Sequence, residues 1–274
     1  MRLLTMFILV LATSSCTHGQ TALRLKITVH SEAGGLPGMS IPVDRASVIY
    51  ADHGRLRVES SGFRQFPALV VIQRCDIHVI YTLDSAKHEY TESPLPSTET
   101  EQKSNEGPPN LVIDTRTVDT GETKSAFGHT AHHYITTTKQ TPSPELDEQP
   151  TERVVDAWYL DIPDVMMCEP ASQRPRGVVG GFIGDARVIQ KTRREFRYSG
   201  LRPEFRYSGP EPKGLVLSEK AITRSVHVLA TGEKQNTELA NSREIVEMSE
   251  VPIDSGLFEV PPGFTKVARI GVSY

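Results

Sequence analysis

The chain has 274 residues, and its 34 acidic and 30 basic side chains give a formal net charge of −4 at pH 7. This composition excludes a protein that binds nucleic acid or an anionic membrane through a global excess of positive charge. The length is sufficient for one large β domain or two small ones, each with a real core.

The first element is an apolar run over residues 3–12, which follows the basic residue Arg2 and precedes three small polar residues. This pattern is typical of a secretory signal peptide, and the run is well short of the roughly twenty residues that span a bilayer as a helix. We therefore expect an exported protein of the periplasm or cell envelope, with residues 1–16 as the signal peptide and a cleavage site between about residues 15 and 22.

Cys16 allows two ways in which the signal peptide is processed. It stands where a bacterial lipoprotein carries its acylated cysteine, although Thr13 occupies the position of the usual leucine. Either Cys16 is lipidated, which would give peripheral membrane association, or an ordinary signal peptidase cleaves the chain.

Two cysteines follow the signal peptide, Cys75 and Cys168. An even number of cysteines in an oxidising compartment favours a disulfide between them, and closing a loop of this length stabilises a fold by roughly 4 to 5 kcal/mol in the chain-entropy model. The alternative is two unrelated buried thiols.

Strand signals dominate the rest of the chain. Residues 22–29 alternate apolar and polar side chains, as a strand with one buried face does. Asp52 and Gly54 suit a hairpin turn between strands at 47–50 and 55–59. Further runs rich in β-branched or aromatic residues predict strands at 68–73, 78–83, 111–118, 131–138, 154–160, 178–190 and 215–229. These strands predict an antiparallel meander.

Other segments predict loops, a turn and one helix. The proline-rich segments 91–110 and 140–151 predict disordered surface loops within a single domain of residues 22–274, with a domain linker as the alternative. Residues 237–248 predict a short helix after Asn236 as its cap. Pro262 and Gly263 fit a type II turn between strands at 257–260 and 265–270.

One hexapeptide, Glu-Phe-Arg-Tyr-Ser-Gly, occurs at residues 195–200 and again at 204–209. Two copies of six residues are too short for a solenoid and indicate a local tandem duplication in a loop or hairpin. Cations mixed with aromatics also occur in single-strand nucleic-acid binders, but an acidic exported chain argues against such a partner.

Few residues suggest a catalytic or metal-binding role. His129 and His133 would share one face of a strand and could begin a metal site, but no third ligand follows at a recognised spacing. The sequence contains no Gly-x-Ser-x-Gly elbow, no His-Glu-x-x-His and no P-loop. We therefore predict no catalytic residues and no cofactor.

Trp158, Tyr159, Met166 and Met167 are candidates for the lining of an apolar ligand pocket. Trp offers a broad surface, and Met adapts to irregular shapes. The alternative is that they are ordinary core and rim residues of a sheet.

Four short segments carry a resemblance to a known family: DTGE at 119–122, FGHTAH at 127–132, WYLD at 158–161 and FEVPPGF at 258–264. The chain resembles, over residues 47–267, an uncharacterised family of exported bacterial proteins with a domain of unknown function, itself similar to the LolA/LolB lipoprotein-carrier half-barrel. The resemblance implies a mainly β fold, in which a curved antiparallel sheet forms a half-open barrel with at most one or two short helices. It brings no catalytic residues.

Three functional hypotheses follow. The first is an envelope half-barrel that binds a lipid, an acyl chain or another apolar ligand. The second is a non-enzymatic interaction or scaffold protein with a filled core, whose loops or sheet edge contact other envelope proteins. The third is a metal-dependent enzyme that uses His129 and His133.

Overall fold

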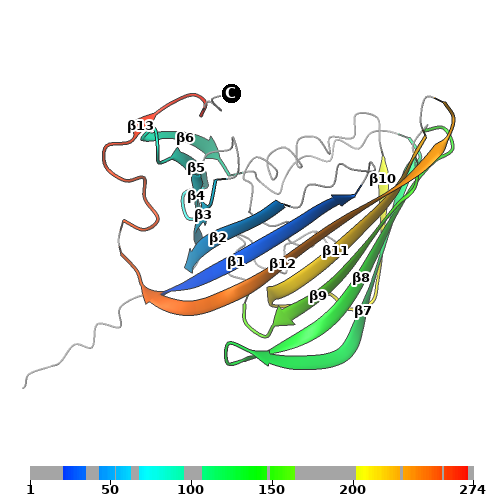
Figure 1. Cartoon of the computed structure of the whole chain (residues 1–274), viewed down its shortest axis with the longest axis horizontal. Helices are drawn as coiled ribbons and strands as arrows, with labels where there is room; N and C mark the ends of the chain where they lie inside the picture. Colours follow the sequence, from blue (N-terminus) through cyan, green and yellow to red (C-terminus); the bar gives the residue numbers. More distant parts are fainter. Residues whose placement is uncertain are drawn as a thin grey trace, which may run out of the picture.

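The computed structural model describes residues 21–34, 43–52, 54–62, 68–95, 107–146, 149–163, 202–228, 231–254 and 256–270. Within these residues the fold is mainly β, and thirteen strands hydrogen-bond into one large open sheet (Figure 1). In sheet order the strands are β10 (Pro203–Ser208), β7 (Leu111–Ala126), β8 (His129–Pro142), β9 (Thr151–Leu160), β11 (Leu215–Val228), β12 (Lys234–Pro252), β1 (Thr21–Gly34), β2 (Val43–Asp52), β3 (Arg55–Ser60), β4 (Leu69–Arg74), β5 (Val79–Asp84), β6 (Glu89–Pro94) and β13 (Thr265–Lys266).

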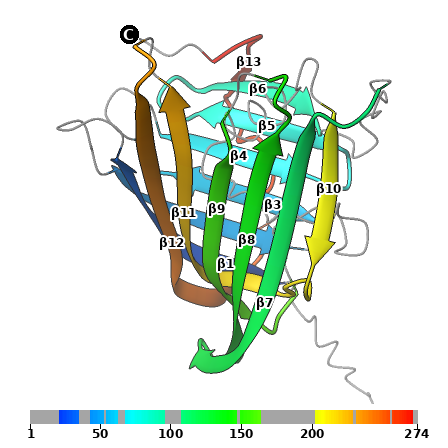
Figure 2. The same cartoon turned by 90° about the vertical axis from the view of Figure 1, so that its right-hand side faces the viewer.

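Neighbouring strands are antiparallel except at the two ends of the sheet. There β10 pairs with β7 in parallel and β13 pairs with β6 in parallel. β1 joins the two halves of the sheet, because it pairs with β2 on one side and with β12 on the other. The sheet twists along its length, so that β3–β6 run across the direction of β7–β12 (Figure 2).

One face of the sheet, here called the core face, is apolar in β1–β4. Because side chains alternate along a strand, Leu25 and Ile27 share this face, and their partners across the ladder are Ile49 for Leu25 and Ile245 for Ile27. These four side chains are at most 3% exposed and belong to a cluster that continues through Val58, Val71, Leu217, Leu160 and Ala131. A continuous apolar core therefore runs along most of the sheet.

The opposite face of β1–β6 is covered by residues 256–264, here called the C-terminal cover. Phe258 is 1% exposed and packs with Ile72 and Leu83. Two arginines hold the cover to the sheet: Arg57 donates to the carbonyl of Leu257 at 3.1 Å, and Arg74 forms an ion pair with Glu259. Figure 1 shows this segment running along the outside of the sheet toward β13.

The core face changes character in the long strands. Arg243 lies two residues before Ile245 and pairs with Glu219, so both side chains lie on the core face, where their ions are 2.8 Å apart and each side chain is 10% exposed. On β7 and β8, the buried hydroxyls of Thr117 and Thr136 lie 3.1 Å apart. Here the core face is ordered by polar pairs as well as by apolar contacts.

The predicted strands that fall on described residues are confirmed for β1 to β5, β7 to β9 and β11. The hairpin at Gly54 is confirmed by its positive φ of 88°, and the turn at Gly263 by a φ of 87°. The strand predicted at residues 178–190 lies outside the described residues.

Three local predictions are wrong. Residues 237–248 form part of β12 and not a helix, because pairing with β1 and β11 on both sides satisfies their backbone as a strand. Residues 91–94 belong to β6, so the predicted loop begins later, and β8 extends to Pro142. Residues 257–260 lie in the turns of the cover and form no strand.

Candidate functional site

The predicted pocket residues do not converge in the part of the chain that the structure describes. Tyr159 is 7% exposed and packs edge-to-face on Tyr134, with 5.6 Å between ring centres, and burial raises the pKa of Tyr134. Trp158 points to the other side of β9, as adjacent strand residues do. Met166 and Met167 lie outside the described residues.

Trp158 belongs instead to a polar cluster built by β7, β8 and β9. The imidazole of His133 stacks on Trp158, with 4.7 Å between ring centres, and Lys124 Nζ lies 4.3 Å from the centre of the indole. His133 Nδ1 is 3.0 Å from Glu122, and its Nε2 is 2.9 Å from Asp156. Since each ring nitrogen faces a carboxylate, this imidazole ties three strands together and leaves no nitrogen open to a metal or substrate.

His129 does not join this cluster. Its Nδ1 lies 3.7 Å from the carboxylate of Asp161, so the two histidines of the metal hypothesis have separate acidic partners. Among the described residues, no three His, Cys, Asp or Glu side chains are placed to hold a metal ion. The same residues contain no helix long and apolar enough to cross a membrane.

Cys75 is disulfide-bonded. It directly follows β4, and its backbone N–H donates to the carbonyl of Gly54 at 2.9 Å. Cys16 and Cys168 both lie outside the described residues, so pairing with Cys168 and lipidation of Cys16 stay predictions.

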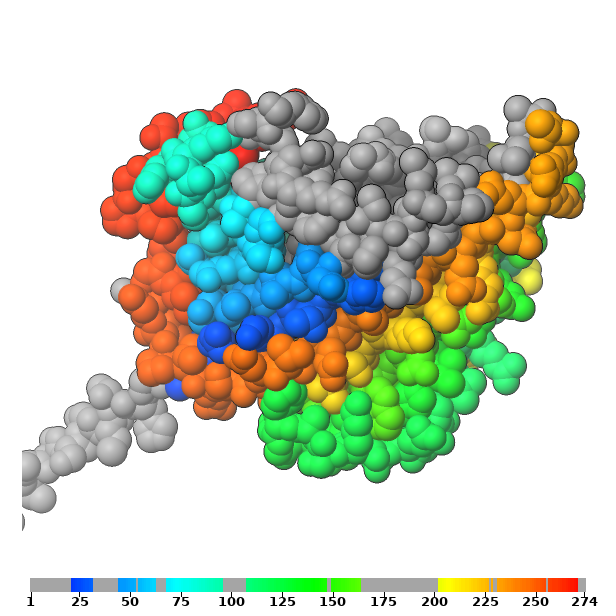
Figure 3. Space-filling view, viewed as in Figure 1, coloured from blue at the N-terminus to red at the C-terminus, as the bar shows by residue number. Residues whose placement is uncertain are grey.

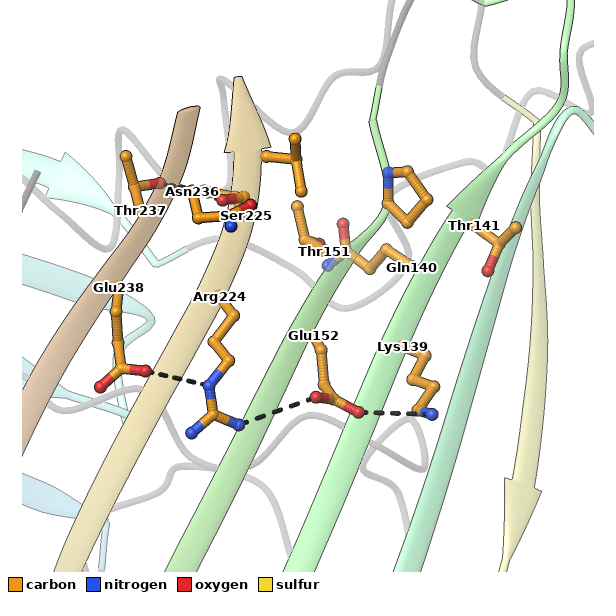
Figure 4. Close-up of a pocket in the computed structure, with 12 residues that line it drawn as sticks. Lys139, Gln140, Thr141, Thr151, Glu152, Arg224, Ser225, Asn236, Thr237 and Glu238 are labelled. Atoms are coloured by element: carbon orange, nitrogen blue, oxygen red, sulfur yellow. Dashed lines mark hydrogen bonds and ion pairs between the residues drawn. The ribbon is translucent and has the colours of Figure 1, made fainter. Parts of the chain in front are cut away.

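A hollow of about 550 Å³ lies where β8 and β11 end and β9 and β12 begin. A ladder of ions crosses it from strand to strand (Figure 4). Lys139 lies 3.3 Å from Glu152, which lies 3.8 Å from Arg224, and Arg224 lies 2.9 Å from Glu238. The ladder has two positive and two negative charges, so the ions that cross the hollow neutralise one another.

The strand β10 forms the end of the sheet beside β7 and presents a pair of exposed aromatics. Phe205 is 46% exposed and Tyr207 is 41% exposed. Their rings are nearly parallel, at 4°, with 6.3 Å between centres, and partial burial raises the pKa of Tyr207. Between them Arg206 donates to Glu204 at 2.8 Å, which raises the pKa of this arginine. No described strand pairs with the outer edge of β10.

β10 is fixed to β7 at both ends. At its start, the backbone N–H of Arg202 donates to Asn110 Oδ1 at 2.6 Å, the N–H of Asn110 donates to the carbonyl of Arg202 at 3.1 Å, and the Arg202 guanidinium donates to the carbonyl of Pro108. At its end, Gly209 has a φ of +88°, and a Cβ there would lie 1.8 Å from the carbonyl oxygen of Thr117. The strand therefore requires glycine at this position.

The duplication was the sequence signal for this site, but it predicted a loop or hairpin and not an edge strand paired in parallel with β7. The ion ladder and the His133 cluster were not predicted, because both depend on the register between strands.

No family model matches the chain, and no curated protein matches it. Among solved structures, the chain is similar to an uncharacterised conserved protein from Thermus thermophilus, with 9% identity, coverage of 90% of each chain and a TM-score of 0.32. This likeness is too weak to carry an argument.

Proposed function

We propose that this chain is an exported, non-enzymatic cell-envelope protein that binds an extended segment of a partner protein at the outer edge of β10. The observation that supports this proposal is the strand itself, which ends an open sheet with two exposed, stacked aromatic rings. An edge strand offers unpaired backbone N–H and C=O groups to an added strand, and neighbouring side chains provide specificity.

The chemistry of the partner follows from the alternation of side chains. Phe205 and Tyr207 are two residues apart and share one face, so a strand added beside them would place alternate residues against the two rings. Apolar or aromatic side chains at two alternate positions suit this contact. On the other face, Glu204 and Arg206 form an ion pair with each other.

The described part of the core supports an interaction protein rather than a carrier of an apolar ligand. The core residues of β1–β4 are nearly fully buried, and the ion ladder occupies the open hollow. A filled core does not explain why the rings of Phe205 and Tyr207 are exposed to solvent at the edge of the sheet.

A photo-crosslinking amino acid at position 205 of the full chain, in its native envelope, tests whether a partner binds at the edge of β10. The matched control carries the same group at Val246, which is similarly exposed, at 41%, but lies on β12, an interior strand of the sheet. From position 205 we expect a crosslink to a partner protein, and the attached peptide should be an extended segment with alternating apolar residues. From position 246 we expect no crosslinked protein. Identical products from both positions, or none from position 205, would contradict the proposal.

The second candidate is a carrier of an apolar ligand with a LolA-like half-barrel, favoured by the apolar cluster that runs along the core face from β4 to β8. Mass spectrometry of the protein from its native envelope, intact and after organic extraction, separates the two candidates. A stoichiometric lipid mass lost on extraction would favour the carrier, and a clean protein mass would favour the interaction protein. A diacylglyceryl mass on Cys16 in the same spectra would establish lipidation.

A further inference from the structure

The strand β10 has the side chains that its own outer edge suits in a partner. A segment added at this edge needs apolar or aromatic side chains at two alternate positions, and β10 has Phe205 and Tyr207 at such positions, with their rings nearly parallel at 4°. No described strand pairs with this edge, which lies beyond β7 at the end of the sheet (Figure 2). A second β10 therefore matches the partner segment in its apolar residues.

We propose that the strand added at this edge is β10 of a second copy of the chain, paired antiparallel about a two-fold axis, a proposal that rests on the function proposed above. A two-fold axis makes each copy present the same surface to the other, so the contact is complete with two chains. β10 has six residues, and a ladder of this length is ordinary for two paired strands.

The charges of β10 select the register of this pairing. When the axis passes beside Phe205, Glu204 lies opposite Arg206 of the second copy, and Arg206 lies opposite its Glu204. Within one copy these two side chains share a face and form an ion pair at 2.8 Å. The four charges then alternate in sign around a square, so each carboxylate has one arginine on its own strand and another across the ladder. Opposite charges that face each other across a ladder stabilise the pairing.

Moving the axis by one residue in either direction removes this agreement. With the axis beside Arg206, the arginines of the two copies face each other, and with the axis beside Glu204, the two glutamates do. Like charges directly opposite each other are destabilising. Of these three registers, the one centred on Phe205 is therefore favoured.

The same register extends the apolar face of the sheet from one copy to the other. Phe205 pairs with Ile113 on β7, and Pro203 pairs with Leu111, and both β7 residues are buried. With the axis beside Phe205, the two Phe205 rings face each other, and each Tyr207 faces Pro203 of the second copy. These half-exposed rings lose contact with water as the pairs form. Because Pro203 begins the strand, its missing N–H affects only an end of the new ladder.

Reversing single charges tests both the partner and the register. In Glu204→Arg, each charged pair across the ladder consists of two arginines, and in Arg206→Glu it consists of two glutamates. Each variant of the purified full chain is expected to raise the dissociation constant of the dimer roughly tenfold, measured by sedimentation velocity over a concentration series. An equimolar mixture of the two variants places arginine opposite glutamate in both pairs, so we expect heterodimers about as stable as the parent dimer.

The double variant Glu204→Arg, Arg206→Glu is the matched control, because it keeps the composition of the parent and keeps opposite charges facing each other. It is expected to dimerise as the parent does. A parent chain that stays monomeric up to the highest concentration measured would overturn the proposal. A mixture that dimerises no better than the single variants would also overturn it, since the loss would then come from changes within one copy of β10.

Single cysteines provide a second readout of the register. Residues directly opposite each other in an antiparallel ladder have Cα atoms about 4.5 to 5.5 Å apart, within the range that a disulfide spans. Phe205→Cys places the new thiols of the two copies opposite each other, whereas Tyr207→Cys, on the same face, places them four residues out of line. In a mild redox buffer, mass spectrometry is expected to find peptides joined through position 205 of two chains and none joined through position 207. Equal yields at the two positions would contradict the register.

The photo-crosslinker at position 205 separates the second copy from other partners. A product of twice the mass of the chain, whose attached peptide contains residues 203–208, would support both the two-fold pairing and the proposed function. A product with a different protein would overturn the two-fold pairing and would still support binding at the edge of β10. No product from this position would contradict both.

Discussion

The short strands β3–β6 and the long strands β7–β9, β11 and β12 belong to one sheet, but different forces hold them together. Each of β3–β6 has six residues, and this part of the sheet is packed by the core cluster on one side and by the C-terminal cover on the other. The strands β7–β9, β11 and β12 have ten to nineteen residues, and polar pairs link them to their neighbours. Figure 3 shows the cover and the short strands packed together at one end of the molecule.

This difference suggests that length and polarity compensate each other. A six-residue strand makes few ladder hydrogen bonds, so its stability depends on apolar area buried from both sides. A long strand has many ladder hydrogen bonds and tolerates polar side chains, provided that each buried one has a partner. We therefore expect substitutions in the two halves to differ in size and in how they combine.

The largest effect is expected at Phe258, the most buried aromatic of the cover. Phe258→Ala removes a ring packed against Ile72 and Leu83 and should lower the free energy of unfolding by about 3 to 5 kcal/mol. Urea unfolding followed by circular dichroism measures this change. Phe205→Ala, on the exposed edge, serves as the control and should cost about 1 kcal/mol or less. Equal losses at the two positions would show that the cover does not stabilise the short strands.

A smaller effect is expected at the ion pair of Arg243 and Glu219. Glu219 lies 2.8 Å from Arg243 and 3.2 Å from Arg153, so Arg243→Met removes the nearer of its two cationic partners. This variant should lower the free energy of unfolding by about 2 kcal/mol. The double variant Arg243→Met, Glu219→Met removes both charges and should cost less than the sum of the single variants in the same unfolding assay. Strict additivity would mean that the two ions contribute independently.

The threonine pair of β7 and β8 should give an effect of about 1 kcal/mol. Thr117→Val leaves the buried hydroxyl of Thr136 without this partner, whereas the double variant Thr117→Val, Thr136→Val replaces both hydroxyls with methyl groups of the same shape. We expect the double variant to regain most of the loss. Thermal unfolding of the parent and of the two variants measures this recovery, and a double variant less stable than Thr117→Val would contradict this interpretation.

Much of the sheet could be predicted from local pattern, because alternation in residues 22–29 and β-branched runs such as 68–73 identify strands without knowledge of their partners. β12 could not, since Leu239, Ala240, Ile245 and Val246 fit a helical spacing, and its pairing with β1 and β11 overrides that preference.

The candidate sites were harder to predict than the strands. His133 meets Asp156, and Arg243 meets Glu219, across strand registers that no local pattern contains. The parallel pairing of β10 with β7 joins residues about ninety positions apart, which the duplicated sequence alone does not suggest.

The smallest expected effect tests whether charge also matters at the short strands. Arg74 at the end of β4 donates two hydrogen bonds to Asp76, at 2.8 and 2.7 Å, and these hydrogen bonds lower the pKa of Asp76. A carboxyl whose pKa is lower in the folded chain stabilises the fold above its unfolded pKa of about 3.9 and loses this contribution as the pH falls through the folded value. Because the Asp76 side chain is 46% exposed, solvent screens the pair, and Asp76→Asn should cost less than about 1 kcal/mol at pH 7.

The urea midpoints of the parent and of Asp76→Asn, compared at pH 7 and pH 3, measure this contribution. The two midpoints should approach each other at pH 3, because the unfolded chain takes up its proton below its pKa of about 3.9, and the advantage of the folded carboxylate begins to fall there. A constant separation at both pH values would mean that Asp76 acts through packing, and the short strands would then depend on apolar burial alone.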